Sequence, residues 1–396
     1  REQEWAHLRR LPGHADLGLD QLQGNFLRLR CDHFTVKWER HTEFTRYSIV
    51  QNLPANAQWG ADLPELAPHV AVGTDWLRGL PGQTMAAIEL GMLSADIDSP
   101  GLIAQAQSWL GPGTVLASRM GNTAEGLSHS CILTHFRIGT DGFERMLVVA
   151  PEGTSEARAG RISQRLLELE TYRLMALRGL PVAKNLSAML SAAEAQLADI
   201  TGLLERKGET DQALLDLLVS LAARIERATA EHGFRFSATR AYDTLVGQRL
   251  TELRERPISG TQTLGEFMQR RLSPAMATVN ATEKRLASLA ERVSRTSALL
   301  RTRVDIATET QNQVLLEKLT RGQELQLRLQ VTVEGLSMAA ISYYVVSLLL
   351  YAFKGLKAYG LPFNPEIAVA LLLPLVLWSV WRSRQKIHEK LHRSDT

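Results

Sequence analysis

Two uncharged segments near the C-terminal end constrain this chain more strongly than any other feature. Residues 335–353 carry no charged side chain, and as an α-helix rising about 1.5 Å per residue they are long enough to cross the hydrocarbon core of a bilayer. Residues 367–381 are also uncharged but would reach only about 22 Å, so this span needs its flanking residues. We therefore predict transmembrane helices at 335–354 and 367–381, joined by an outer loop at 355–366.

The flanks of the second span support this prediction. Asn364, Pro365 and Glu366 favour a helix start, because Asn caps free amides, Pro fits the first turn and Glu stabilises the positive end of the helix dipole. Basic residues follow the span at once, which favours a membrane hairpin over a buried hairpin of a soluble protein. They are Arg382, Arg384, Lys386, Lys390 and Arg393.

The distribution of basic residues predicts the orientation of the hairpin. Five Lys and Arg residues lie in the tail, 382–396, whereas the loop region has only Lys354 and Lys357. By the positive-inside rule the tail is cytoplasmic, and two spans return the chain to its starting side. We predict a multi-pass protein with both termini in the cytoplasm and the lipid bilayer as a partner.

Residues from about 26 to 150 alternate in the manner of strands, and residues 1–150 are predicted to form a cytoplasmic α/β domain. Residues 34–38 and 44–50 carry β-branched and aromatic side chains at period two, which indicates a hairpin. Further strands are predicted at 85–93, 115–120, 131–138 and 143–149, with a short helix at 102–110. The simplest architecture is one mixed sheet with helices packed on it.

After residue 151 the apolar period changes to 3.6, which predicts a helical domain at 151–260 and a long stalk helix at 261–334. Individual helices are expected at 156–178, 182–206, 210–232, 238–256 and from 262 onward. No proline interrupts residues 275–353, so one helix of about 120 Å would run from the cytoplasmic body into the membrane. One subunit of this size cannot bury such a stalk, so we expect a homo-oligomer.

A stripe of small or polar residues recurs at alternating steps of three and four along this helix. In the first span it consists of Ser337, Ala340, Tyr344, Ser347 and Tyr351. Followed backward at the same phase, it continues through the stalk as Asp305, Glu309, Asn312, Leu316, Leu319, Gln323, Gln326 and Gln330. Within a span, such a stripe faces protein or water rather than lipid.

Several copies of this helix around an axis would line it with oxygen ligands, which suit hard cations. Rings of Leu316 and Leu319 would interrupt them and could close a pore by dewetting. Alternatively, the charged and amide-rich face of the stalk is simply the solvated face of a long helix. An undistorted helix drifts by about 20° per heptad, so the stripe would not keep one direction along the whole length. We prefer the solvated face for the stalk and a protein-facing or pore-facing stripe for the span.

The composition agrees with a large soluble body that carries a membrane hairpin. The chain has 396 residues, 45% of them hydrophobic, and its net charge of +3 is too small to argue for nucleic acid as a partner. Cys31 and Cys131 form neither a CxxC motif nor a disulfide framework, which suits a reducing compartment. The chain lacks an initiator Met and begins in a helical stretch, residues 1–11, so we expect an upstream segment.

The strongest enzyme-like group is formed by Glu39, His41 and Glu43, which on a hairpin could share one face and bind a metal or move a proton. Solvation or pairing with Arg40 and Arg46 is the commoner role of such residues, and we prefer it. The chain has no GxxxxGKS/T phosphate loop, no GxGxxG turn after a strand and no GxSxG elbow. We therefore do not expect an enzyme, and the sequence identifies no catalytic residue, cofactor or metal ligand.

Several long motifs occur along the chain, namely WERHTEF (38–44), QRLLELETYR (164–173), GLPVA (179–183), FRFSATRAY (234–242), RPISGTQTL (256–264) and RRLSPAM (270–276). Together they resemble a bacterial family described only as uncharacterised membrane-anchored proteins. These motifs extend over nearly the whole chain. The resemblance implies the bacterial inner membrane as the location and brings no activity.

The layout also resembles the CorA group of divalent-cation channels. That group has a cytoplasmic α/β domain, a long stalk helix that becomes the pore-lining span, a short outer loop, a second span and a basic tail, assembled as a pentamer. The resemblance implies Mg²⁺ or another divalent cation as the transported or regulatory ion.

The outer loop of the CorA group carries the signature YGMNF, and YGLPF (359–363) stands in the same place here. Pro362 occupies the Asn position and has no amide side chain to offer a hydrated ion, so the signature is altered. Asn364 could replace that amide only in a rearranged loop. The loop residues of interest are Tyr359, Gly360, Phe363, Asn364 and Glu366.

These observations leave three hypotheses. The first is a CorA-like homo-oligomeric cation channel or transporter of the inner membrane, gated by its cytoplasmic domain. The second is a membrane-tethered cytoplasmic scaffold or sensor with the same layout but no ion conduction. The third, a membrane-anchored enzyme that uses Glu39, His41 and Glu43, is the one we favour least.

Overall fold

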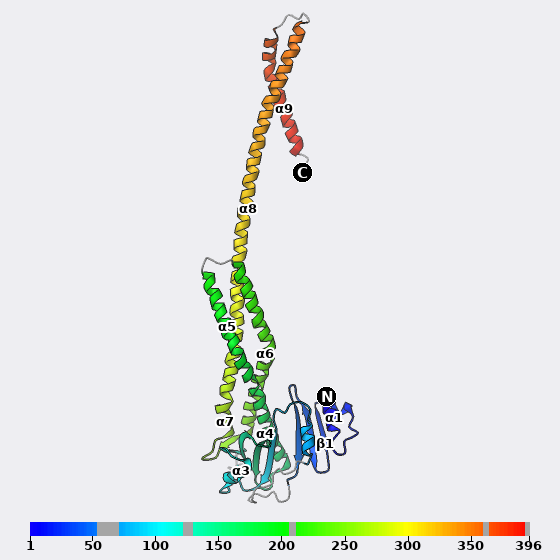
Figure 1. Cartoon of the computed structure of the whole chain (residues 1–396), viewed down its shortest axis with the longest axis vertical. Coiled ribbons are helices and arrows are strands. Elements are labelled where there is room, and N and C mark those ends of the chain that lie inside the picture. Colours follow the sequence, from blue (N-terminus) through cyan, green and yellow to red (C-terminus); the bar gives the residue numbers. More distant parts are fainter. Residues whose placement is uncertain (54–70, 122–129, 206–210, 359–363, 393–396) are drawn as a thin grey trace. The chain divides into compact units, whose positions relative to one another are not determined.

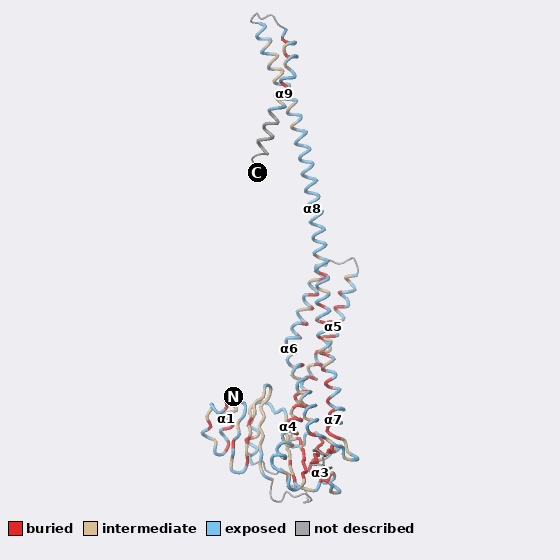
Figure 2. The backbone as a smooth tube through the Cα atoms, turned by 180° about the vertical axis from the view of Figure 1, so that it is seen from behind, coloured by how far each residue is buried: buried red, intermediate tan, exposed pale blue. Residues whose placement is uncertain are grey.

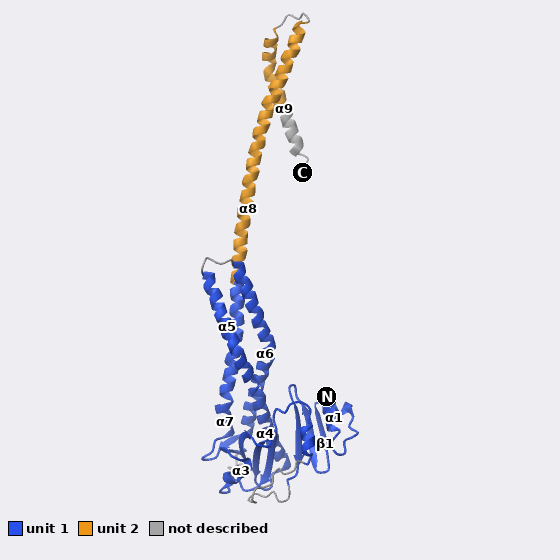
Figure 3. Cartoon of the chain, in the orientation of Figure 1, with its two compact units in different colours: residues 1–298 blue, residues 299–396 orange. Residues whose placement is uncertain are grey.

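The computed structural model describes residues 1–53, 71–121, 130–205, 211–358 and 364–392, with side chains as far as residue 382. The chain divides into two compact units, Arg1–Ala298 and Leu299–Thr396 (Figure 3). Within the described residues, the first unit holds every strand and the second is helical. An α/β N-terminal part is therefore followed by helices, as predicted.

A three-stranded antiparallel sheet in the order β1-β2-β3 opens the first unit (Figure 1). Its strands are β1 (Phe26–Arg30), β2 (Phe34–Arg40) and β3 (Thr45–Gln51), and β2 pairs with both neighbours. The period-two pattern of β2 buries Phe34, Val36 and Trp38 on one face. Three short helices close the same core, namely α1 (Glu2–Leu8), η1 (Leu19–Leu22) and α2 (Thr74–Arg78).

A separate five-stranded mixed sheet has the order β4-β7-β6-β5-β8. Its strands are β4 (Ile88–Ser94), β5 (Leu116–Met120), β6 (Ser130–Ile138), β7 (Glu144–Ala150) and β8 (Glu255–Pro257). Strand β4 runs parallel to β7, and the other pairs are antiparallel. Helix α3 (Leu102–Leu110) covers this sheet, and Trp109 packs into a core with Leu133 and Leu147.

The predicted single mixed sheet is therefore wrong, although the predicted strands and the helix at 102–110 are present. The two sheets have separate hydrophobic cores. Alternation along the sequence predicts that a segment is a strand, but the choice of partner strand is non-local. It depends on side-chain packing that the pattern does not contain.

Long helices make up the rest of the first unit. They are α4 (Glu156–Leu177), α5 (Gly179–Glu205), α6 (Asp211–Leu253), α7 (Leu264–Arg271) and the first part of α8 (Ser273–Ala358). Arg285 of α8 donates from Nε to Glu194 of α5 at 3.1 Å, and Arg240 of α6 pairs with Glu283 of α8. These contacts bind the start of α8 to α5 and α6, which lie beside it in Figures 1 and 2.

Two helix breaks predicted at glycines have different outcomes in the structure. A break was predicted at 179–181, but the helices are interrupted one residue earlier, at Arg178, and Gly179 begins α5. Glycine is required at 179 because a Cβ atom would overlap the side chain of Thr239 on α6. The break predicted at Gly233 is wrong, since α6 continues through it. Glycine inside a helix costs only about 1 kcal/mol, and the packing of α6 against α4 and α5 outweighs that cost.

The second unit contains the rest of α8 and helix α9 (Pro365–His392). Helix α9 begins where predicted, with Pro365 in its first turn and the Ala368 N–H donating to the Asn364 carbonyl at 3.2 Å. It continues through Pro374 and beyond residue 381, so the predicted basic tail begins as helix. By length and composition both helices could cross a membrane, with mean hydropathy of 1.8 and 1.4 in their most apolar windows.

Candidate functional site

The apolar end of α8 has one face directed toward α9, which turns back beside it (Figure 2). On α8, Ser342, Val345 and Leu349 are partly covered and fall on one face at about 100° per residue. On α9, Val369 and Val376 are buried, at 7% and 8% exposure. Mainly aliphatic side chains therefore form the contact within the hairpin.

The stripe predicted in the first span lies on the opposite face of α8. Tyr344 is 66% exposed and Tyr351 is 71% exposed, Ser337 and Ala340 are exposed as well, and Ser347 is intermediate. Tyr351 follows Ser342 by nine residues, which corresponds to about 180° around an α-helix. The small and hydroxyl-bearing residues thus lie on the side away from α9, where a single chain leaves them mostly uncovered.

The outward face of α9 has a different character. Ile367, Leu371, Leu375 and Trp378 are all exposed and all apolar or aromatic. Side chains of this kind suit contact with lipid, whereas serine and tyrosine hydroxyls in a span call for protein or water. The outward face of α9 therefore suits contact with lipid, whereas the outward face of α8 suits contact with protein or water.

The stalk part of the stripe, from Asp305 to Gln330, is exposed at every predicted position, and Leu316 and Leu319 are 63% and 65% exposed. Helix α8 is α-helical throughout its 86 residues. On a straight helix, a stripe with a heptad repeat turns around the helix axis by about 20° per heptad. Between Asp305 and Tyr351 the stripe therefore turns by roughly 130°. One axis could face the whole stripe only if the helices supercoiled, so a solvated stalk and a pore-lining stalk both stay predictions.

The outer-loop residues Tyr359, Gly360 and Phe363 lie outside the described residues, as does Pro362. Asn364 and Glu366 are exposed at the start of α9. The altered CorA-like signature therefore stays a prediction.

The carboxylates of the predicted Glu39, His41 and Glu43 group are held by arginines. Arg46 donates from Nε to Glu39 at 2.7 Å, and Glu43 forms an ion pair with Arg235 of α6. Of the predicted pairing with Arg40 and Arg46, the pair of Glu39 with Arg46 is confirmed, whereas Arg40 lies 3.7 Å from Glu4. Glu39 thus joins β2 to β3 within the hairpin, and Glu43 attaches the hairpin to α6.

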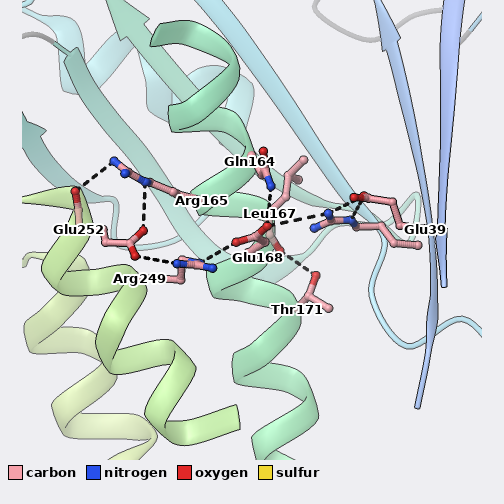
Figure 4. A network of polar contacts seen from close by, with 9 residues as sticks. Glu39, Gln164, Arg165, Leu167, Glu168, Thr171, Arg249 and Glu252 are labelled. Carbon is pink, nitrogen blue, oxygen red and sulfur yellow. Dashed lines mark hydrogen bonds and ion pairs between the residues drawn. The ribbon is translucent and has the colours of Figure 1, made fainter. Parts of the chain in front are cut away.

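Figure 4 shows that the first of these pairs continues into a network between helices. Arg46 lies 3.9 Å from Glu168 of α4, and Glu168 accepts hydrogen bonds from Gln164 at 2.8 Å and from Arg249 of α6 at 2.6 Å. Arg249 also donates to Glu252 at 2.8 Å, and Glu252 pairs with Arg165. The alternating charges fix the first sheet against α4 and α6.

His41 lies at the tip of the same hairpin. Its ring stacks on Phe44, with centroids 4.3 Å apart, and its Nε2 atom is buried without a hydrogen-bond partner. Burial and the positive charge of Arg46 lower the pKa of His41. Among the described residues no three His, Cys, Asp or Glu side chains are grouped so that they could hold a metal ion.

A buried charged cluster in the first unit was not predicted from the sequence. It consists of Glu144 at the start of β7 and of Glu170 and Arg173 on α4, and Arg173 donates from Nε to Glu170 at 2.6 Å. Burial and the neighbouring Glu170 raise the pKa of Glu144 to about 9, so Glu144 keeps its proton at neutral pH. Glu170 and Arg173 lie on the same helix face as buried Leu166 and Leu169. In the sequence, charged residues on an otherwise apolar helix face are the pattern that could have indicated this cluster.

The described residues define a protein with an α/β and helical unit, followed by a helical hairpin apolar enough to enter a membrane. The chain belongs to the family described as Protein of unknown function (DUF3422), which matches residues 1–391. The predicted membership of an uncharacterised family is thereby confirmed, whereas the resemblance to the CorA group stays a prediction. No curated protein and no solved structure matches the chain.

Proposed function

We propose that this protein is a CorA-like homo-oligomeric channel or transporter for cations in the bacterial inner membrane. In the assembly, α8 lies next to the axis and α9 faces the lipid. Mg²⁺ or another divalent cation is the proposed cargo, and the number of subunits proposed from the CorA resemblance is five. The first unit and both termini are proposed to lie in the cytoplasm.

One observation carries the proposal, namely the opposite character of the two outward faces of the hairpin. Tyr344 and Tyr351 are exposed on α8, while Leu371 and Leu375 are exposed on α9. A lone hairpin in a bilayer would turn the α8 hydroxyls toward hydrocarbon, where a polar group without a partner costs several kcal/mol, about 2 to 7 by transfer scales. A ring with α8 inside gives those hydroxyls protein or water as neighbours and leaves the apolar face of α9 to lipid.

The second candidate is a membrane-tethered scaffold or sensor that forms the same ring without conducting. It is favoured by the altered loop, in which Pro362 stands at the Asn position, and by Lys354 and Lys357 near the proposed outer mouth, which would repel cations. In this alternative the hydroxyl stripe packs helix against helix and leaves no water path.

Cysteine cross-linking in the membrane tests which face of the hairpin meets another copy. In a chain with Cys31→Ser and Cys131→Ala, the variants Tyr344→Cys and Ser337→Cys are expected to form disulfide-linked dimers on mild oxidation. The matched control is Leu371→Cys on the outward face of α9, for which we expect little cross-linking. Cross-linking at Leu371 but not at Tyr344 or Ser337 would contradict the arrangement.

Flux measurements then separate the two candidates. The purified full chain in liposomes that contain a Mg²⁺-sensitive dye is expected to admit Mg²⁺ down its gradient, compared with empty liposomes. An oligomer cross-linked through Tyr344 that admits neither Mg²⁺ nor other divalent cations would exclude the channel and favour the scaffold or sensor.

A further inference from the structure

A pocket of about 410 Å³ lies where the first hairpin meets the helices of the first unit. The tip of the hairpin contributes Arg40, His41 and Thr42, and Asn25 lies just before β1. The opposite wall comes from Tyr172 of α4 and Tyr242 of α6. Among the lining residues only Leu245 is aliphatic, so the wall is polar and aromatic.

Two nitrogen atoms of this wall are buried without a hydrogen-bond partner. They are Nη1 of Arg40 and Nε2 of His41. The nearest charge partner of Arg40 is Glu4, at 3.7 Å, which is too long for a good hydrogen bond. Buried polar atoms in native proteins nearly always have a partner, so these two nitrogens point to a group that the chain itself does not supply.

Two carboxylates near the pocket are engaged elsewhere, since Glu39 accepts from Arg46 and Glu43 pairs with Arg235. A third, Glu4, lies beside Arg40 but does not line the pocket, and none of the described lining residues is acidic. The lining therefore combines a guanidinium, an imidazole, an amide and three hydroxyls. This set of donors suits a carboxylate or phosphate group.

The hairpin tip holds these donors in a fixed backbone geometry. The Arg40 N–H donates to the Asn25 carbonyl at 2.8 Å, and the His41 N–H donates to the Phe44 carbonyl at 2.8 Å. The ion pair between Glu43 and Arg235 ties the end of the loop to α6. Binding would therefore require little ordering of the chain, which favours affinity.

The side chains of Tyr172 and Tyr242 form a wall suited to contact the part of a ligand that carries no charge. The rings of Tyr172 and Tyr242 lie 5.9 Å apart at an interplanar angle of 31°. Aromatic rings in this position offer apolar surface to the body of a small molecule. The hydroxyl of Tyr172 already forms a hydrogen bond with the side chain of Arg249.

We propose that this pocket binds a small organic anion, with its carboxylate or phosphate at Arg40 and His41 and its body against Tyr172 and Tyr242. Because the pocket lies within the first unit, the proposal does not depend on ion conduction. The ligand would bridge the first hairpin, α4 and α6.

Calorimetric titration of the detergent-solubilised full chain tests this site. The probes are inorganic phosphate, citrate and adenosine monophosphate, at equal ionic strength. We expect saturable binding of at least one probe. Binding of citrate alone would assign a carboxylate ligand, and binding of adenosine monophosphate or phosphate would assign a phosphate-bearing one.

Variants identify the site. Arg40→Gln is expected to weaken the bound probe by about tenfold or more, because a hydrogen bond to a charged group is lost. Arg137→Gln, which removes an exposed arginine that does not line the pocket, is expected to leave the affinity unchanged. If Arg40→Gln lowers the unfolding temperature, Thr42→Val takes its place with the same direction of effect. The proposal is overturned if no probe binds at millimolar concentration, or if the pocket variants bind as the original chain does.

Discussion

At the scale of single residues, the buried cluster of Glu144, Glu170 and Arg173 is the most unusual feature of the first unit. The side chain of Glu170 is fully buried and that of Glu144 is 6% exposed, with one arginine between them. Two carboxylates beside one cation in a dry site cannot both ionise without a large cost, so one of them keeps a proton. Glu144, whose pKa is raised to about 9, is that residue.

This cluster predicts a pH dependence of stability. In the unfolded chain the pKa of Glu144 is near its ordinary value of 4.5, whereas in the folded chain this pKa is about 9. Between these values the folded state binds more protons, so stability falls as pH rises from about 5 to 9, by up to about 1.4 kcal/mol per pH unit. Glu144→Gln keeps a neutral side chain of the same shape and is expected to reduce this slope.

The unfolding free energy of the solubilised chain between pH 5 and 9 is the measurement. Glu152→Gln, an exposed position, is the control and should leave the slope as it is. Equal slopes for the original chain and for Glu144→Gln would show that Glu144 is not protonated in the folded state.

At the scale of elements, local patterns predicted most helices and strands and the pairing of β2 with β3, but not the division of the strands into two sheets. The strand at 34–40 alternates between buried and partly exposed residues along most of its length, and the helix at 102–110 has the predicted bounds. Strand β8 was missed, because it has three residues and exists only through pairing with β5. The carboxylates of the candidate site were found, whereas the pocket was not, since Tyr172 and Tyr242 are distant in sequence and meet only through packing.

The start of α7 gives a prediction at this scale. Thr263 and Glu266 form a capping box, in which the Glu266 N–H donates to the Thr263 hydroxyl and the Thr263 N–H donates to Glu266, both at 3.1 Å. Thr263→Ala is expected to lower the unfolding free energy by about 1 kcal/mol, whereas Thr263→Ser keeps the hydroxyl and should lower it much less. Chemical denaturation measures both. An equal loss in the two variants would assign the effect to the methyl group instead.

At the scale of the whole molecule, the two units differ in how much apolar surface a single chain leaves exposed. The first unit buries many of its large apolar residues in defined cores. In the second unit Ile306, Leu325, Leu329 and Leu348 are all more than 60% exposed. Soluble monomers rarely expose apolar surface on this scale, which supports the proposal that lipid surrounds the hairpin and that other copies of the chain cover the stalk.

The last prediction concerns the path that such an assembly would form. If Leu316 and Leu319 point toward its axis, their rings repel water and limit ion passage, so Leu316→Ser and Leu319→Ser should raise Mg²⁺ flux into liposomes several-fold. Leu325 is 61% exposed and follows Leu316 by nine residues, about 180° around the helix, so Leu325→Ser is a control of the same chemistry on the opposite face. If all three variants behave alike, these leucines do not constrict a pore, and the solvated interpretation of the stalk holds. A rise confined to Leu316 and Leu319 would place that face of α8 at the axis, because loss of a leucine from the outside of the stalk cannot widen the path.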